Sequence, residues 1–499
     1  MQAHIQSSPI SRRQLLSLGA GLLCPLNAHA NAAWFPTFTS LTQEIEKQPL
    51  MVKGKLPSDL KGHLYRAGPV HFEQANGKRY THWFDGDGGI LDIHLNGHGQ
   101  AVASMKRLET PGFIKEQQAG QVLYPSYGTP TTKALRKILR RQFKNVANTN
   151  VISLHDQLYA LVESAPPTMV DKDTLARTGE TTFGGAIKGG FSAHPHRHAD
   201  GKTVFNVGME LGLKPKLHVY AVQQSRQCQR LLTISNPHSA MLHDFALTQK
   251  HMVLIQPPLH LDFKKVLDSN GAVSDGLVWD GSRGTKITII PLNAPEQHQS
   301  WTVDPFYQWH IGNAWEEGQE MFIDLVKYAD FSSNKALGNL IHGDGNTGEL
   351  NGRLTRLRFN PRTGVASPLF EASHSGEFPQ TSASIWSQRN RLMYLAEHST
   401  EAVSRAGLPD TLCQYDLETG RRNGVQISPR SYPSEPVAVP KKNAKHPEES
   451  WILSVIYDSE SQTSRLAVFD SEAFSAGPVA TADFGRPIPM TFHGHWQAD

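Results

Sequence analysis

The sequence predicts an all-β fold. Short runs of aliphatic, β-branched and aromatic residues recur along the chain, and residues that favour turns separate them. The run at residues 354–359, for example, is followed directly by residues 360–364, whose sequence Asn-Pro-Arg-Thr-Gly is typical of a turn. The 41 Gly and 31 Pro among 499 residues also fit a protein rich in turns. Strands and hairpins are therefore expected to dominate.

Further runs of the same kind mark other expected strands. They lie at residues 158–162, 252–256, 286–292, 392–396, 451–457 and 466–469. No exact repeat appears at a fixed period. Hairpin groups of four strands, spaced regularly over a chain of this length, favour a β-propeller. Composition alone would fit a pair of β-sandwiches equally well.

Composition and charge exclude two classes of protein. A hydrophobic content of 38% suits a globular protein with a sizeable core and argues against a disordered chain. The formal net charge is +3, and Arg12 and Arg13 near the N-terminus supply two of those charges. The remainder is almost neutral, so nucleic acid is not an expected partner. Histidine stands out with 24 copies, and histidine is the commonest metal ligand.

Residues 1–30 are interpreted as a twin-arginine signal peptide. Arg12 and Arg13 directly precede an apolar run at residues 15–26, which ends at the small-residue site Ala-His-Ala of residues 28–30. The alternative is a chance Arg-Arg pair near a disordered start. The interpretation predicts a periplasmic protein whose mature part, residues 31–499, is a single domain. This export route carries folded proteins, which suits a protein that must acquire a metal before export.

The apolar run at residues 15–26 is too short to span a bilayer, and no later stretch approaches the ~20 apolar residues that a spanning helix needs. The mature protein is therefore expected to be soluble or peripheral. Cleavage would remove Cys24 and leave Cys228 and Cys413, so the mature protein could form one disulfide, between these two residues. No cysteine cluster suited to zinc or an iron–sulfur centre is present.

One segment departs from the β pattern. Residues 132–144 place Leu135, Ile138, Leu139 and Phe143 on one helical face, with basic residues around it. This pattern predicts a basic amphipathic helix. Such a helix either lies on the domain with a solvated basic face or touches a membrane surface through which an apolar substrate enters. The sequence leaves both interpretations open.

Four histidines stand in stretches that are expected to be buried. They are His194, His243, His310 and His493. A buried imidazole needs a polar partner, and a hydrogen-bonded core position satisfies that need as well as a metal does. The four residues are far apart in the sequence and form no local metal motif. Residue pattern alone therefore does not decide between the two.

A set of motifs at these and other positions resembles the carotenoid cleavage oxygenase family, which includes carotenoid, apocarotenoid and stilbene dioxygenases and the retinal pigment epithelial membrane protein. The motifs appear in order over nearly the whole mature chain, at residues 62–69 (GHLYRAGP), 82–88 (HWFDGDG), 148–150 (NTN), 193–195 (AHP), 242–248 (LHDFALT), 310–317 (HIGNAWEE), 376–379 (GEFP), 434–436 (SEP) and 492–494 (FHG).

The resemblance implies a seven-bladed β-propeller, with a dome of loops and helices over an axial metal site. It further implies that His194, His243, His310 and His493 bind Fe(2+), one from each of four blades. Imidazole ligands suit iron, zinc, copper and nickel alike, so only the resemblance selects iron. The neighbouring His196, His198 and His495 fall outside the matching motif positions and are not expected to be ligands.

The resemblance also implies a set of supporting residues. Glu163, Glu377 and Glu435 match the family's glutamates that accept the second N–H of the metal-bound imidazoles. Thr149 matches the threonine that approaches an open coordination position, where it shapes oxygen access. Asp85 lies in a glycine-rich block that lacks the ligand spacing of a calcium loop, and the block is interpreted as a turn.

The implied activity is cleavage of a conjugated C=C bond in a carotenoid or apocarotenoid by dioxygen, which gives carbonyl products. Stilbene-cleaving members carry a lysine directly before the first of these glutamates, whereas this chain has Val162 there. That difference favours an apolar polyene over a phenolic stilbene. Three further hypotheses stay open: a stilbene-type (lignostilbene) dioxygenase, a redox-neutral isomerase, and a non-catalytic propeller that serves as a binding module.

Overall fold

The computed structural model describes residues 32–131, 142–154, 156–211, 214–268, 272–345 and 348–499. Residues 32–499 form one compact unit. The expected signal peptide and residues 132–141 of the expected amphipathic helix lie outside the described residues. No described helix combines the length and the apolar character needed to cross a membrane.

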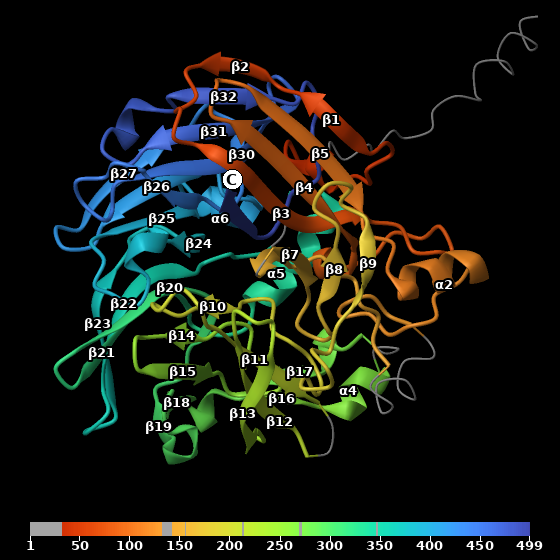
Figure 1. The fold of residues 1–499 in the computed structure, drawn as a ribbon. Helices are drawn as coiled ribbons and strands as arrows, with labels where there is room; N and C mark the ends of the chain where they lie inside the picture. Colours follow the sequence, from red (N-terminus) through yellow and green to blue (C-terminus); the bar gives the residue numbers. More distant parts are fainter. Residues whose placement is uncertain (1–31, 132–141, 155, 212–213, 269–271, 346–347) are drawn as a thin grey trace, which may run out of the picture. The chain divides into compact units, whose positions relative to one another are not determined.

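The described residues of the larger unit form a seven-bladed β-propeller, whose antiparallel sheets are arranged around a common axis (Figure 1). Blade 1 pairs β1 (Ile45–Pro49), β5 (Ala101–Arg107), β4 (Asp87–Asn96), β3 (Lys61–His71) and β33 (Gly494–Ala498), in that order. Blade 2 contains β6 (Asn150–Leu154), β7 (Gln157–Leu161), β8 (Thr168–Val170) and β9 (Arg177–Glu180). Blade 3 contains β10 (His196–Arg197), β11 (Val204–Glu210), β12 (Lys216–Val222) and β13 (Cys228–Ser235).

The remaining blades follow in chain order. Blade 4 contains β14 (Ala246–Leu247), β15 (His251–Gln256), β18 (Thr285–Pro291) and β19 (Gln299–Val303). Blade 5 contains β20 (Tyr307–Glu317), β21 (Glu320–Tyr328), β22 (Arg353–Asn360) and β23 (Val365–Glu371). Blade 6 contains β24 (Gly376–Gln380), β25 (Leu392–Glu397), β26 (Thr411–Asp416) and β27 (Arg421–Val425). Blade 7 contains β2 (Met51–Gly54), β32 (Ala480–Asp483), β31 (Thr463–Asp470) and β30 (Ser450–Asp458), with β28 (Ser431–Pro433) and β29 (Val437–Pro440) both paired to β30.

Strands from both ends of the chain close the ring. In blade 1, β33 pairs with β3, and in blade 7 the early strand β2 pairs with the late strand β32. Such pairing leaves no open gap between the first and last blades and holds the two ends of the fold together by backbone hydrogen bonds.

The strand predictions are confirmed. The run expected at residues 286–292 is β18 (Thr285–Pro291), and the run at 354–359 is β22 (Arg353–Asn360). Their apolar side chains pack between neighbouring blades. Ile287 of blade 4 and Ile323 of blade 5, for example, belong to one buried cluster and are fully buried. Burial of each such side chain contributes about 1.5–3 kcal/mol, so contacts of this kind hold one blade to the next.

Helices and long loops gather at one end of the propeller. In an antiparallel blade, the loop from the second strand to the third lies at the same end as the connection to the next blade. The described insertions occur in those two kinds of connection. They contain α2 (Pro111–Ala119), the hairpin of β16 (Leu259–Leu261) and β17 (Leu277–Trp279), α4 (Phe263–Asp268), α5 (Ser333–Asn339), η6 (Leu340–His342) and α6 (Glu401–Ala406). These segments form the dome.

Helix α2 shows how local sequence defines a dome element. Thr110 caps its N-terminus by accepting a hydrogen bond from the Phe113 N–H at 3.3 Å, and Pro111 occupies the first turn. Gly120 ends the helix with φ of 59°, a conformation that glycine adopts without steric cost.

One expectation needs correction. Residues 142–144 are not helical, so the expected helix does not extend to Lys144. The Lys144 ammonium is buried between the Asp87 and Glu116 carboxylates, at 2.6 and 2.9 Å, instead of lying on a solvated face. The sequence left open whether the two remaining cysteines pair, and the structure shows that they do not. Cys228 and Cys413 are free thiols and belong to blades 3 and 6.

Candidate metal centre

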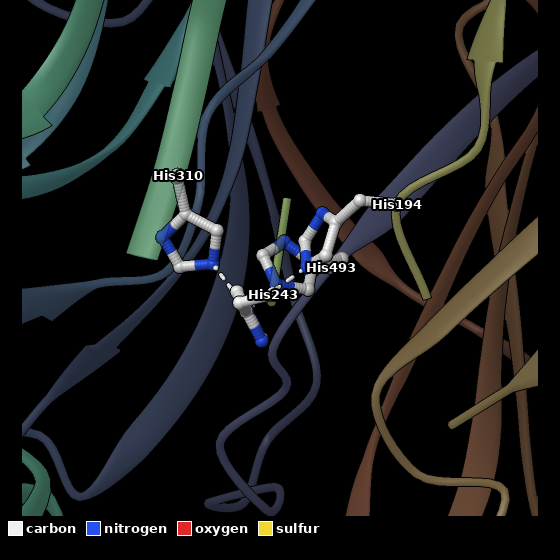
Figure 2. Close-up of side chains that lie close together, drawn as sticks. All are labelled: His194, His243, His310 and His493. Carbon is white, nitrogen blue, oxygen red and sulfur yellow. Dashed lines mark hydrogen bonds between the residues drawn. The ribbon is translucent and has the colours of Figure 1, made fainter. Parts of the chain in front are cut away.

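Four histidine side chains converge inside the propeller (Figure 2). His194 lies two residues before β10, His243 lies just before β14, His310 is within β20, and His493 directly precedes β33. Each thus comes from the edge strand, or from the entry to the edge strand, of a different blade. Blades 3, 4, 5 and 1 supply them. The geometry therefore brings together one histidine from each of four blades, as expected from the sequence.

The facing ring nitrogens are as close as ligands of one ion. The Nε2 atoms of His194 and His243 are 3.0 Å apart, and those of His243 and His310 are 3.3 Å apart. One ligand nitrogen from each of the four rings lies within 4.8 Å of the others. Two imidazoles on one ion, at metal–nitrogen distances of about 2.1 Å, place their nitrogens roughly 3.0–3.4 Å apart, depending on the coordination angle.

Three of the four imidazoles contact a carboxylate through Nδ1, the ring nitrogen that faces away from the other histidines. His310 Nδ1 donates to Glu377 Oε2 at 2.6 Å, and His493 Nδ1 donates to Glu435 Oε1 at 2.9 Å. The Nδ1 atom of His243 contacts the carboxylate of Glu163. The three glutamates come from blades 6, 7 and 2, the blades that supply no histidine. All seven blades therefore contribute a side chain to the centre.

These contacts fix the tautomer of the rings. An Nδ1 that donates to a carboxylate leaves a lone pair on Nε2. The Nε2 lone pairs of His310 and His493 consequently point into the cluster of four rings, where they are repulsive without a cation between them. The donor set therefore fits a divalent metal ion that accepts nitrogen ligands.

Burial keeps two of the rings neutral. It lowers the pKa of His194 and of His493 well below the usual range, and the neighbouring imidazoles lower it further. Neutral imidazole is the form that binds a metal. For His310, burial acts to lower the pKa, but the charge and hydrogen bond of Glu377 outweigh it and raise the pKa. For Glu163, burial acts to raise the pKa, but the His243 imidazole outweighs it and lowers the pKa.

A cavity of about 630 Å³ opens beside this centre. Three of the imidazoles, those of His243, His310 and His493, form part of its wall. Most of the remaining wall is apolar or aromatic and includes Trp83, Phe84, Phe143, Val162, Met241, Leu261, Trp309, Phe378, Leu408 and Phe492. These residues come from both the propeller and the dome, so the dome encloses the cavity over the metal centre.

Thr149 and Val162 both line the cavity, as the sequence predicts for residues next to substrate and oxygen. The Thr149 N–H donates to the Leu161 carbonyl at 3.0 Å, which extends the β6–β7 ladder, and its hydroxyl donates to Asn148 Oδ1 at 3.1 Å. Asn148 in turn donates to the carbonyls of Phe84 and Gly86 at 2.9 and 2.8 Å. Thr149 therefore has a fixed position at the cavity wall.

The three histidines that were not expected to be ligands lie outside the cluster of four. His196 Nε2 is 2.8 Å from Asp244 Oδ1, and His198 Nε2 is 3.0 Å from the Gln249 carbonyl. His495 is part of β33, and burial lowers its pKa to about 4.

Two residues that support the centre were not singled out from the sequence. Asp244 joins the entry of blade 4 to β20, because its Oδ2 accepts the Ile311 N–H at 2.8 Å. Arg66 is fully buried and donates to the carbonyls of Glu435 and Phe492, both at 3.0 Å. Arg66 thus ties the Glu435 segment to the residue before His493. Asp244 lies in the motif at residues 242–248, and Arg66 lies in the motif at residues 62–69. Their place in these motifs was the sequence feature from which a supporting role could have been predicted.

The glycine-rich block at residues 82–88 also does more than turn the chain. Asp85 is buried and accepts hydrogen bonds from the Tyr127 N–H at 2.7 Å and the Thr129 hydroxyl at 2.6 Å. Burial raises the Asp85 pKa to about 6, although these hydrogen bonds act to lower it. The block therefore fastens a dome loop above the cavity.

Comparison with known proteins agrees with this architecture. A family model described as retinal pigment epithelial membrane protein matches residues 38–498. An apocarotenoid-15,15'-oxygenase from Synechocystis is 26% identical over 481 residues, which cover 93% of this chain and 96% of the relative. A carotenoid cleavage oxygenase from Mycobacterium tuberculosis is 22% identical and covers 91% of this chain and 95% of the relative.

Solved structures give the same result for the fold. A variant of the Synechocystis apocarotenoid oxygenase matches with a TM-score of 0.85 and 25% identity, over 94% of this chain and 98% of the other. A cobalt-substituted form of that oxygenase matches with a TM-score of 0.82 and 24% identity. The family match covers nearly the whole described unit, and the chain therefore belongs to the retinal pigment epithelial membrane protein family, that of the carotenoid cleavage oxygenases.

Proposed function

We propose that this protein is an iron(II)-dependent dioxygenase that cleaves one conjugated C=C bond of a carotenoid or apocarotenoid. One dioxygen is consumed, and each carbon of the broken bond receives one oxygen atom, so two carbonyl products form. The observation that supports this most directly is the apolar cavity with three of the four clustered imidazoles in its wall. An apolar polyene gains free energy by leaving water for such a cavity.

His194, His243, His310 and His493 would hold the ion, and Glu163, Glu377 and Glu435 would orient three of the rings. Bound iron(II) would supply a centre at which dioxygen meets an electron-rich double bond. The residues of the chain perform the other tasks. The aromatic wall excludes water and aligns the polyene, and Thr149 limits the space beside the centre. The carboxylates of Glu377 and Glu435 keep the Nε2 lone pairs of His310 and His493 directed inward.

The cavity wall favours a polyene over a phenol. Val162 is buried and lies in the wall directly before Glu163, so it offers no charge to a phenolate. Relatives that share this architecture are named for carotenoid and apocarotenoid cleavage, among them the Synechocystis and Mycobacterium tuberculosis oxygenases. These two observations support the carotenoid class, and the oxygenase names support an oxidoreductase activity.

The test is reconstitution of the purified protein with iron(II) without oxygen, followed by oxygen and a panel of carotenoids, apocarotenoids and hydroxystilbenes. Product aldehydes are identified by mass. We expect paired carbonyl products from a polyene, whose masses sum to substrate plus two oxygen atoms, and none from the iron-free protein. Zinc reconstitution serves as the metal control. Cleavage of stilbenes alone would replace the proposed substrate class.

The isomerase and binding-module hypotheses predict different results in the same experiment. An isomerase would return products of unchanged mass without oxygen consumption. A binding module would retain the polyene, unchanged, and its affinity would not require the four histidines. Either outcome would overturn the dioxygenase proposal.

A further inference from the structure

Blade 1 carries a second group of metal-binding side chains, away from the propeller axis. His63 on β3 and His94 on β4 are directly opposite each other across the two strands. Asp499 follows β33, on the other side of β3, and its backbone N–H donates to the Lys61 carbonyl at 3.2 Å. Three strands that meet in one sheet therefore bring two imidazoles and one carboxylate together.

The ligand atoms of this group already lie close to one another. Asp499 Oδ1 is 3.7 Å from His63 Nε2, and Asp499 Oδ2 is 3.6 Å from His94 Nε2. The two imidazole rings are stacked, with centroids 4.4 Å apart, and all the candidate ligand atoms lie within 4.8 Å of one another. A tetrahedral ion with bonds of about 2.0–2.1 Å needs ligand separations of about 3.3 Å and ring planes that converge on the ion. The two carboxylate–imidazole distances must therefore shorten slightly, and the partly exposed His94 ring must turn out of the stack.

We propose that His63, His94 and Asp499 form a second metal site, which takes a divalent ion of the zinc class. Two imidazoles and one carboxylate are ligands that zinc, cobalt and nickel accept, whereas magnesium and calcium prefer oxygen ligands alone. Three protein ligands on a partly exposed surface leave one coordination position to water.

A carboxylate behind one of the rings supports this assignment. His63 Nδ1 lies 2.9 Å from Asp92 Oδ1, and Asp92 is on β4, two residues from His94. An Nδ1 that donates to Asp92 directs the Nε2 lone pair of His63 toward Asp499. Carboxylate, imidazole and metal arranged in this sequence are a common feature of zinc sites, because the carboxylate fixes the ring and raises its basicity.

The surroundings allow the ion to enter. The Lys61 ammonium is 3.5 Å from Asp499 Oδ2, but its side chain is 58% exposed and is free to turn toward solvent. The site is also separate from the axial centre. Asp499 stands six residues after His493 along extended chain, which corresponds to about 20 Å at roughly 3.3 Å per residue.

An ion at this site would connect three strands of blade 1. His63 and His94 hold β3 and β4, and Asp499 holds the end of β33, so the ion would resist separation of β33 from β3. The strand β33 begins directly after His493. The second site therefore stabilises the pairing that keeps the last axial histidine in place, without contacting the axial ion.

Zinc binding to the iron-loaded protein tests the proposal. Equilibrium dialysis above neutral pH, with metal analysis, counts the zinc that binds in addition to the iron. We expect one equivalent in the parent protein and at least a 10-fold loss of affinity in His94→Gln and in Asp499→Asn. Asp92→Asn should bind zinc about 10–100-fold more weakly, because it keeps the ligands but loses the supporting charge.

Two controls separate this site from other sources of zinc binding. His98→Gln removes an exposed imidazole of the same hairpin and should bind zinc as the parent does. His310→Ala, which alters the axial centre, should keep the affinity of the second site. Zinc should also raise the unfolding temperature of the parent but not of Asp499→Asn. The proposal is wrong if the parent takes up no zinc beyond the axial centre, or if the Asp499→Asn variant binds it equally well.

Discussion

The Tyr328 hydroxyl donates a 2.6 Å hydrogen bond to Glu377 Oε1, while the other oxygen of the same carboxylate accepts from His310. Tyr328 is the last residue of β21 in blade 5, and Glu377 is the second residue of β24 in blade 6. A blade 5 hydroxyl therefore holds the blade 6 carboxylate, and that carboxylate orients the His310 imidazole of blade 5. A largely enclosed carboxylate that accepts two side-chain hydrogen bonds has little freedom to rotate.

Tyr328→Phe should therefore weaken metal binding and turnover without abolishing either. The variant leaves Glu377 with its charge but removes one hydrogen bond, and we expect less than a 10-fold loss in iron affinity, a smaller effect than loss of the carboxylate itself. Competition with a chelator measures the affinity. Tyr307→Phe is the matched control, since that hydroxyl makes a weak contact to Met241 Sδ at 3.9 Å and so has little bonding to lose. Equal affinities in parent and Tyr328→Phe would count against this role.

Replacement of the histidine ligands should reduce iron binding and turnover more than replacement of the carboxylates that contact them. Alanine at His194, His243, His310 or His493 should abolish turnover and lower bound iron, because no nearby side chain on a rigid blade fills the vacated position. Glutamine at Glu163, Glu377 or Glu435 should cost about 10–100-fold in iron affinity or rate. Metal analysis and steady-state kinetics provide both measurements. His198→Ala, whose imidazole bonds to the Gln249 carbonyl, should match the parent. A fully active variant at any of the four histidines would remove that residue from the ligand set.

Val162→Lys should reduce turnover of an apolar polyene. An ammonium in the cavity wall, without a phenolate partner, is costly to bury and repels an apolar chain. We expect a higher KM for the polyene. Val162→Met adds bulk without charge and separates the two effects. Unchanged polyene kinetics in Val162→Lys would mean that position 162 does not face the substrate, and the preference for polyenes over stilbenes would lose that support.

Stability should fall in mild acid because of His82. Its Nε2 donates to the Asn334 carbonyl at 3.2 Å, and its Nδ1 accepts the Phe84 N–H at 3.2 Å, so the buried ring is neutral. Burial lowers the His82 pKa to about 4, against an ordinary value of 6.5. As pH falls, His82 is therefore protonated at a higher pH in the unfolded state than in the folded state. The contribution of neutral His82 to the free energy of unfolding is complete above pH 6.5 and is lost as the pH falls toward 4. The loss amounts to about 2 kcal/mol between pH 6.5 and pH 5.

Urea unfolding at a series of pH values measures this loss. The slope of unfolding free energy against pH should be smaller in His82→Gln than in the parent over that interval, by about half a proton at pH 6.5 and nearly one proton at pH 5. His98→Gln, at an exposed position, should keep the parent slope. An unchanged slope in His82→Gln would show that His82 titrates alike in the folded and unfolded states.

We also propose that residues 1–30 direct export by the twin-arginine route. Arg12→Lys together with Arg13→Lys should leave the protein in the cytoplasm with its leader uncleaved, while the parent reaches the periplasm in its shorter form. Cell fractionation with an antibody to the mature part checks both compartments. Normal export of the double variant would rule out this route.

Local structure could be predicted from the sequence better than assembly could. The strand at residues 286–292 was predictable, because its β-branched residues are buried in the sheet whatever the global fold. The number of blades and their closure through β3 and β33 depend on pairing between opposite ends of the chain, which no local pattern encodes. The strand pattern favoured a propeller, but composition fitted a pair of sandwiches equally well, and only the family resemblance implied seven blades.

The same difference applies to the site. His194 and His196 are two residues apart and chemically identical, yet only His194 faces the other three imidazoles, whereas His196 faces Asp244. Alternation along a strand does not separate them, because residues two apart in a regular strand point to the same face. His194 precedes β10, whereas His196 begins it, so the irregular backbone before the strand sets the direction of His194. Lys144 was expected at the end of a basic helix, and two carboxylates distant in sequence bury it instead. Contacts of this kind appear only once the chain is folded.

Ring closure gives the axial centre a kinetic property. His493 is held in place by β33, and the hydrogen bonds between β33 and β3 are one of the two strand pairings that close the ring. An ion held by all four imidazoles leaves readily only when one of them withdraws, and an edge strand such as β33, which pairs with one neighbour only, opens at a lower free energy than a strand paired on both sides. The residence time of the bound ion should therefore depend on how often β33 separates from β3. The rate of metal loss would then measure how stably the ring is closed.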